Sequence, residues 1–140
     1  GKTTTNPGPF VGDNTYNATG VNQDVTVKNF SELDGAFYTF EISIQNDGRL
    51  TDQFTIKATG APGTSWTVTY WHDTTNITAA VEQGTYLTPP LATGAADHVM
   101  ARISLRSGGD VNRLVTITSS AAPVLVDAVS FGYKETACGC

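Results

Sequence analysis

The sequence predicts an all-β protein built from two antiparallel sheets packed face to face. Three observations predict this class. Apolar and polar residues alternate with a period of two along most of the chain, helical spacing is almost absent, and turn-forming residues separate the alternating runs. A chain of 140 residues is the size of one domain with one core. We therefore expect a single folded domain.

A long alternating run covers residues 36–45, where Tyr38, Phe40 and Ile42 fall on one face and Phe37, Thr39 and Glu41 on the other. Val25 and Val27 begin the series, and further runs lie at 54–57, 66–71, 99–106, 115–118 and 124–133. Roughly seven or eight such strands fit an antiparallel two-sheet Ig-like sandwich. A closed barrel is the alternative, which the uneven loop lengths disfavour. The expected core residues are Tyr38, Phe40, Ile42, Ile56, Trp66, Val68, Tyr70, Ile103 and Ile117.

The two ends of the chain differ from this pattern. Residues 1–9 have no apolar alternation and contain Pro7 and Pro9, which predicts an extended N-terminal arm or edge segment. The sandwich is expected over 10–131, and 132–140 is expected to be a C-terminal extension.

The composition excludes several classes of function. Charged residues make up 15% of the chain and the net charge is -5, so a nucleic-acid partner is not expected. Neither an apolar stretch of spanning length nor a basic run is present, which argues against membrane insertion. The threonine, serine, asparagine and glycine content is typical of extracellular β-proteins. We therefore expect a secreted, extracellular or cell-surface location.

The ionisable residues suggest no catalytic arrangement. His72 and His98 stand at strand ends with no nucleophile or metal motif around them, so we expect no enzyme activity, no cofactor and no catalytic residue. Acidic residues gather in expected loops, where turn formation is the favoured interpretation and calcium binding the alternative. These residues are Asp13, Asp47, Asp52 and Asp73.

Two aromatic residues fall on the polar faces of their strands. Trp71 and Phe37 have threonine and glutamate as same-face neighbours. Such side chains can contact a protein partner or stack on a sugar ring. We interpret them as a candidate partner or glycan surface, with cover by protein favoured over sugar binding.

The cysteines and three short motifs suggest modifications. Cys138 and Cys140 are the only cysteines, and we expect them to be oxidised, either to each other or across a subunit boundary. Binding of a soft metal is a third alternative. Candidate N-glycosylation sites are Asn17, Asn29 and Asn76, although a threonine-rich chain produces such triplets by chance.

Several phrases in order carry a resemblance to a known family. They are 12–20 (GDNTYNATG), 45–48 (QNDG) with 51–54 (TDQF), 66–70 (WTVTY), 77–81 (ITAAV) and 91–95 (LATGA). Together they resemble the Ig-like modules of large secreted bacterial proteins of the cell-adhesion-related (CARDB) type, over roughly Phe10 to Val129. The resemblance implies an extracellular, non-enzymatic scaffold or adhesive domain, without a defined ligand.

Two functions are consistent with these expectations. The leading hypothesis is a structural subunit that assembles with copies of itself into a filament or surface layer through addition of a terminal strand. The alternative is a monomeric adhesion or carbohydrate-binding module, whose partners would be glycans or other surface proteins.

Overall fold

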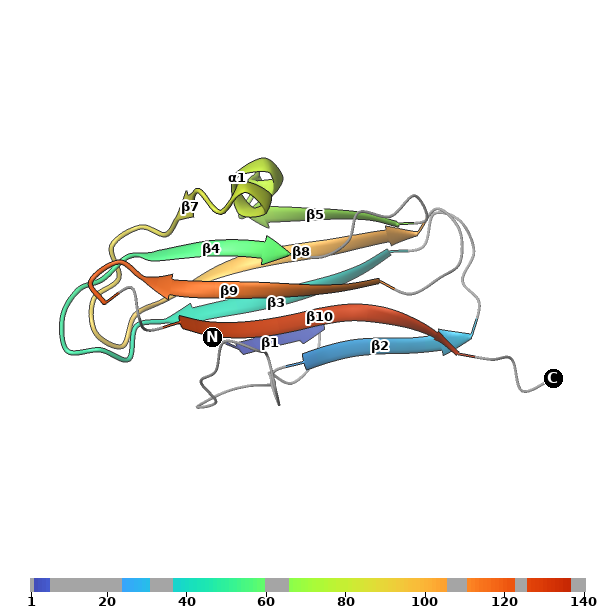
Figure 1. Cartoon of the computed structure of the whole chain (residues 1–140), viewed down its shortest axis with the longest axis horizontal. Helices are drawn as coiled ribbons and strands as arrows, with labels where there is room; N and C mark the ends of the chain where they lie inside the picture. The colour runs from blue at the N-terminus through green and yellow to red at the C-terminus, as the bar shows by residue number, and fades with distance from the viewer. Residues whose placement is uncertain are drawn as a thin grey trace.

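The computed structural model of the chain is a two-layer β-sandwich (Figure 1). The structure describes residues 2–5, 24–30, 37–59, 66–105, 111–122 and 126–136. Each layer is a five-stranded sheet in that part of the chain. One strand in each sheet, β6 or β7, has only two residues, so each sheet has four longer strands.

The two sheets take their strands from distant parts of the sequence. Sheet A has the order β1 (Lys2–Thr5), β3 (Phe37–Gln45), β8 (Ala96–Leu105), β5 (Trp66–His72) and β6 (Thr75–Asn76). Sheet B has the order β2 (Asp24–Phe30), β10 (Val126–Thr136), β9 (Val111–Ser119), β4 (Phe54–Thr59) and β7 (Tyr86–Leu87). The short helix α1 (Thr78–Gln83) follows β6 and lies above β5 and β4 in Figure 1.

This strand order is that of an immunoglobulin-like fold. In that fold, strands A, B, E and D form one sheet, and strands C, F and G form the other. Here β1, β3, β8 and β5 occupy the first set of positions, and β4, β9 and β10 occupy the second. The fold class predicted from the sequence is therefore confirmed.

The core lies between the sheets and follows the predicted alternation. Phe40 and Ile42 are fully buried, whereas Phe37 on the other face of β3 is 57% exposed. Aromatic contacts join the sheets: Phe40 packs on Phe131 with ring centroids 5.0 Å apart, Tyr38 stacks on Tyr133 at 5.4 Å, and Tyr70 packs edge-on to Phe131 at 6.0 Å. Of the expected core residues, these are buried: Phe40, Ile42, Ile56, Val68, Tyr70, Ile103 and Ile117. Tyr38 is partly buried against them, and the side chain of Trp66 lies outside the described part.

Three features depart from the simple pattern. First, β2 pairs with β10 in parallel, so the otherwise antiparallel sheets contain a parallel edge strand. Second, the alternation did not predict α1, a single short helix of six residues. Third, β10 continues without a break to Thr136, so the expected boundary at residue 132 falls inside a strand. The arm, by contrast, contains the edge strand β1 at 2–5, which pairs with β3.

Candidate functional site

Three loops meet at one end of the sandwich, and Asn46 joins two of them, the β3–β4 loop and the β7–β8 loop. Its side-chain Nδ2 donates to the carbonyl of Leu91 at 2.7 Å and to that of Leu50 at 2.8 Å. Its backbone N–H donates to Ala95, and its carbonyl accepts from Gly94. Asn46 is 2% exposed, so its polar groups need these partners. The β3–β4 and β7–β8 loops are therefore fixed to each other.

Asp52 performs the same task for the β9–β10 loop. Its carboxylate accepts hydrogen bonds from the hydroxyl of Ser119 and from the backbone N–H groups of Ala121 and Gln53. Desolvation tends to raise the pKa of Asp52, but these hydrogen bonds outweigh it and hold the pKa below its usual value. Asp52 Oδ1 thus accepts from two backbone N–H groups and Oδ2 from the Ser119 hydroxyl, so the carboxylate fixes the β3–β4 loop to the β9–β10 loop.

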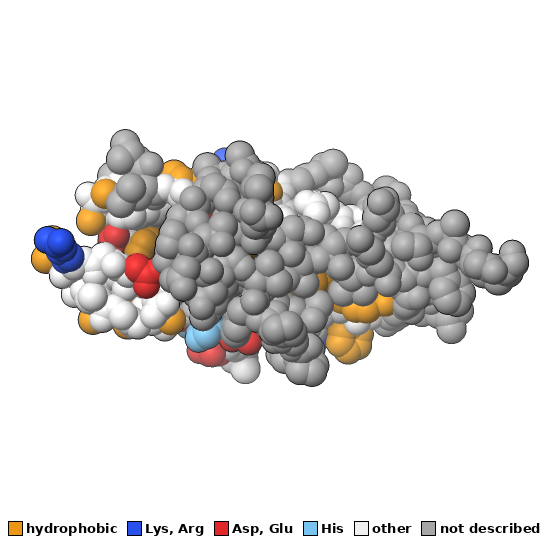
Figure 2. Space-filling model, turned by 90° about the horizontal axis from the view of Figure 1, so that it is seen from below, with side chains coloured by type: hydrophobic (Ala, Val, Ile, Leu, Met, Phe, Trp, Pro, Cys, Tyr) orange, Lys and Arg blue, Asp and Glu red, His pale blue; other side chains and the backbone are white. Residues whose placement is uncertain are grey.

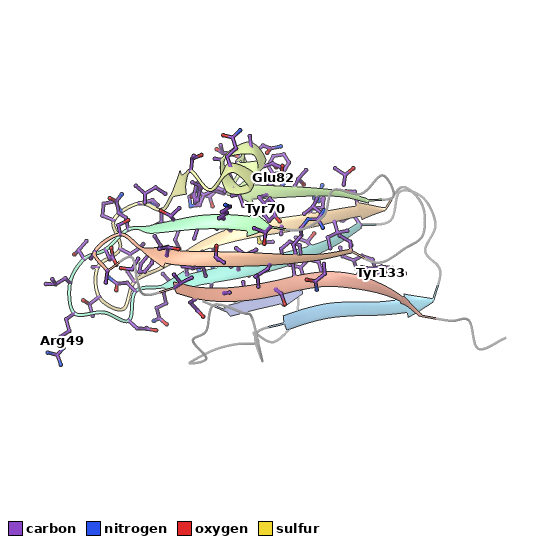
Figure 3. All side chains as sticks on the ribbon, in the orientation of Figure 1. Arg49, Tyr70, Glu82 and Tyr133 are labelled. Atoms are coloured by element: carbon purple, nitrogen blue, oxygen red, sulfur yellow. The ribbon has the colours of Figure 1, made fainter. Side chains whose placement is uncertain are left out.

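The tip of the β3–β4 loop extends beyond this network. Leu50 is 76% exposed, and Arg49 points away from the sandwich at its left end in Figure 3. Figure 2 shows hydrophobic and basic side chains gathered at the same end. The loop is thus rigid at its base and exposes an apolar and a cationic side chain.

The outer face of sheet A carries both aromatic residues singled out in the sequence. The Arg102 guanidinium lies 4.7 Å from the centre of the Phe37 ring, a cation–π contact on an exposed ring. Trp71 is half-buried, and its indole N–H donates to Thr69 Oγ1 at 3.0 Å. The register places Phe37 at one edge of this face and Trp71 near the other, so they do not form one aromatic cluster.

Each histidine pairs with carboxylates. His72 Nε2 lies 2.8 Å from Asp97 Oδ1, and its Nδ1 lies 3.7 Å from Asp73 Oδ2. His98 Nδ1 lies 2.7 Å from Glu41 Oε1. Burial and the nearby carboxylates raise the pKa of Tyr86, whose ring lies beside His72. No group of three metal-binding side chains occurs within the described residues.

Most of the expected modification sites cannot be placed. Cys138, Cys140 and Asn17 lie outside the described residues, as does the side chain of Asn29 in β2. Asn76 is exposed, and its Oδ1 accepts from the Thr78 N–H at 3.0 Å. The glycosylation and disulfide predictions therefore stay predictions.

The backbone edges of sheet A form a further candidate site, which the sequence did not reveal. On one edge, β1 pairs with residues 40–43 of β3 and with no other described strand. On the opposite edge, β6 pairs with Trp71 and His72 at the end of β5. Next to them, the Tyr70 N–H donates to Thr78 Oγ1, and the Tyr70 carbonyl accepts from the Ile77 N–H, each at 2.9 Å.

The rest of β5 has one edge that pairs with no described strand. Because Tyr70 bonds to the segment entering α1, its backbone groups point away from β8. Backbone direction alternates along an antiparallel strand, so the groups of Val68 and Trp66 point the same way. Nothing in the described part of the chain pairs with them. We call residues 66–69 on this side the open edge of β5. It depends on where α1 docks, so alternation alone could not have indicated it.

Comparison with known proteins gives likenesses of fold only. No family model matches the chain, and no curated protein sequence matches it. Among solved structures, the secreted serine protease VesC from Vibrio cholerae has 14% identity and a TM-score of 0.48, over 81% of this chain and 21% of that one. The N-terminal domain of PorA has 12% identity and a TM-score of 0.46, over 83% of this chain and 89% of that domain.

A third structure is SSP-19, an MSP-domain protein like family member in Caenorhabditis elegans. It has 15% identity and a TM-score of 0.40, over 80% of this chain and 94% of that one. With TM-scores this low, the likenesses carry no argument about function, and the fold class rests on the strand order. The resemblance to the cell-adhesion-related type remains an interpretation of the sequence phrases.

Within the described residues, no helix is long and apolar enough to cross a membrane.

Proposed function

We propose that the protein is an extracellular structural subunit that assembles with copies of itself into a filament or surface layer by addition of its N-terminal strand. The observation that supports this most is the position of β1. It is a four-residue strand near the start of the sequence, at the edge of sheet A. It pairs with only four of the nine residues of β3. An edge strand held by so few pairs is suited to join neighbouring subunits.

The energetics of strand addition are favourable for such a segment. Each backbone hydrogen bond contributes about 0.5–1.5 kcal/mol net, so even a short strand adds several contributions at once. In the sequence, 18 residues (6–23) separate β1 from β2. Movement of β1 therefore need not displace the strands that enclose the core.

The proposed role is structural and not catalytic. His72 and His98 are each engaged with carboxylates, an arrangement that supports a stabilising function for both. The subunit would act by shape and backbone pairing, without a cofactor.

The test is a deletion of residues 1–9, followed by size-exclusion chromatography and negative-stain microscopy. We expect the intact protein to assemble and the shortened protein to remain folded but monomeric, because the core strands are untouched. Circular dichroism serves as the folding control. An intact protein that stays monomeric at high concentration, or a shortened one that still assembles, would contradict the proposal.

A monomeric adhesion or carbohydrate-binding module is the second candidate. The exposed ring of Phe37, with Arg102 against it, favours this alternative because such a pair can contact a sugar or a protein. Binding of the monomer to a glycan array, lost on Phe37→Ala and retained on Leu87→Ala, would support it.

A further inference from the structure

We infer that the open edge of β5 is the acceptor on which a second copy of the chain places its β1. This inference rests on the proposed assembly and names the surface that receives the strand. The two partners are therefore the opposite edges of one sheet: β1 on one side and residues 66–69 of β5 on the other.

The direction of the strands fits this contact. The direction of the strands in sheet A reverses from each strand to the next, because β1 is antiparallel to β3, β3 to β8 and β8 to β5. Along the sheet, β1 and β5 therefore run in opposite directions. If a second copy lies beside the first in the same orientation, its β1 is antiparallel to the β5 of the first. The joint thus continues the pattern of the sheet.

The symmetry of this contact predicts an open assembly. The surface that one copy uses, β1, differs from the surface the next copy uses, β5, so the interface is heterologous. A heterologous interface that does not close into a ring produces a filament. Sheet A would then run through neighbouring subunits, with adjacent strands about 4.8 Å apart.

The length and charge of the two edges also match. The strand β1 has four residues, and the open edge of β5 covers the four positions 66–69 before the segment entering α1 occupies Tyr70. The helix α1, which packs against β5, exposes Glu82 and has no basic residue in its last turn (Figure 3). The only charged residue of β1 is Lys2, of opposite sign. Charge complementarity thus favours a second copy as the occupant.

Disulfide trapping in the full-length chain tests the contact. In a background with Cys138→Ser and Cys140→Ser, one variant carries Thr4→Cys in β1. Two others carry Thr67→Cys or Thr69→Cys in β5, which covers two registers on one face. Thr4 is in register with Glu41, which shares the outer face of sheet A with both β5 positions. We expect mixed variants to form a disulfide-linked dimer under oxidation, and the double variants Thr4→Cys/Thr67→Cys or Thr4→Cys/Thr69→Cys to form a ladder of multimers.

Two controls make the result specific. Thr116→Cys on β9, which belongs to sheet B, replaces the β5 cysteines and should give no ladder with Thr4→Cys. Glu41→Cys tests exchange of β1 onto the β3 of a neighbour. A cross-link between separate chains at positions 4 and 41, without one to β5, would overturn the inference and leave the proposed assembly standing. Absence of the β5 cross-link in a protein that assembles overturns it equally. An intact protein that never assembles would overturn both.

Discussion

Tyr70 illustrates how much the packing of this protein tolerates at the level of one residue. The side chain is 1% exposed and packs edge-on to Phe131 with centroids 6.0 Å apart, and its hydroxyl has no hydrogen-bond partner among the described residues. Burial in the core raises its pKa, because the phenolate would be poorly solvated there. An unpaired buried hydroxyl costs free energy.

The first prediction concerns this hydroxyl. We expect Tyr70→Phe to leave the free energy of unfolding unchanged or to increase it by about 1–2 kcal/mol, because the ring is kept and only an unpaired group is removed. Urea denaturation followed by fluorescence measures the change. The matched variant Tyr70→Ala should lower stability by about 3–5 kcal/mol through loss of the ring. A clear loss of stability in Tyr70→Phe would show that the hydroxyl has a stabilising partner.

Asn46 and Asp52, by contrast, are polar side chains whose hydrogen-bonding groups have partners. Both satisfy backbone groups of neighbouring loops, and both stand in stretches that the sequence marks as turns. The turn chemistry was predictable from Asn46-Asp47-Gly48. The partners, which are more than forty residues away for Leu91, were not, because they depend on which loops the fold brings together.

At the scale of the element, β9 and β10 depend on a single glycine. A Cβ on Gly132 would lie 2.3 Å from the backbone oxygen of Val111, a distance that side chains do not adopt without a shift of the backbone. The two residues belong to adjacent paired strands, so the shift would disturb the β9–β10 pairing where β9 begins.

The second prediction follows from that contact. We expect Gly132→Ala to lower the free energy of unfolding by about 1–3 kcal/mol, because overpacking forces the strands apart. The control is Gly94→Ala in a loop, where no atom lies within 4 Å of the added Cβ and only the positive φ of 82° is unfavourable. Thermal melting compares the two. Equal effects would show that the β9–β10 contact relaxes at little cost.

The elements also show where sequence reasoning was sufficient. The strands β3, β4, β8 and β9 follow from alternation, because one face of each contacts the core and the other does not. The helix α1 could not be predicted from the sequence pattern, since its six residues are too few to show helical periodicity. Its place is determined by tertiary contacts at Tyr70 and by Gly84, whose φ of 74° ends the helix. The parallel pairing of β2 likewise depends on the position of β10, which no local pattern contains.

At the scale of the whole molecule, the first and last strands occupy different positions in the sandwich. The strand β1 adds to an edge of sheet A, whereas β10 lies inside sheet B between β2 and β9. In Figure 1 the long red strand β10 lies between β9 and β2. The expected C-terminal extension of 132–140 therefore begins within a strand of the sandwich.

The last prediction compares two C-terminal truncations. Deletion of 137–140 should leave the melting temperature close to that of the intact chain, because β10 ends at Thr136. Deletion of 132–140 should prevent stable folding. It removes five of the seven β10 residues that pair with β2, together with Tyr133, which is 1% exposed and stacks on Tyr38. Loss of a buried aromatic side chain alone costs about 3–5 kcal/mol, a large part of the stability of a domain. Both truncated proteins lack the two cysteines, so a difference between their melting curves reports on 132–136 alone. If the two truncated proteins have the same melting temperature, residues 132–136 contribute nothing to the stability of the fold. The boundary at 132 expected from the sequence is then the correct one.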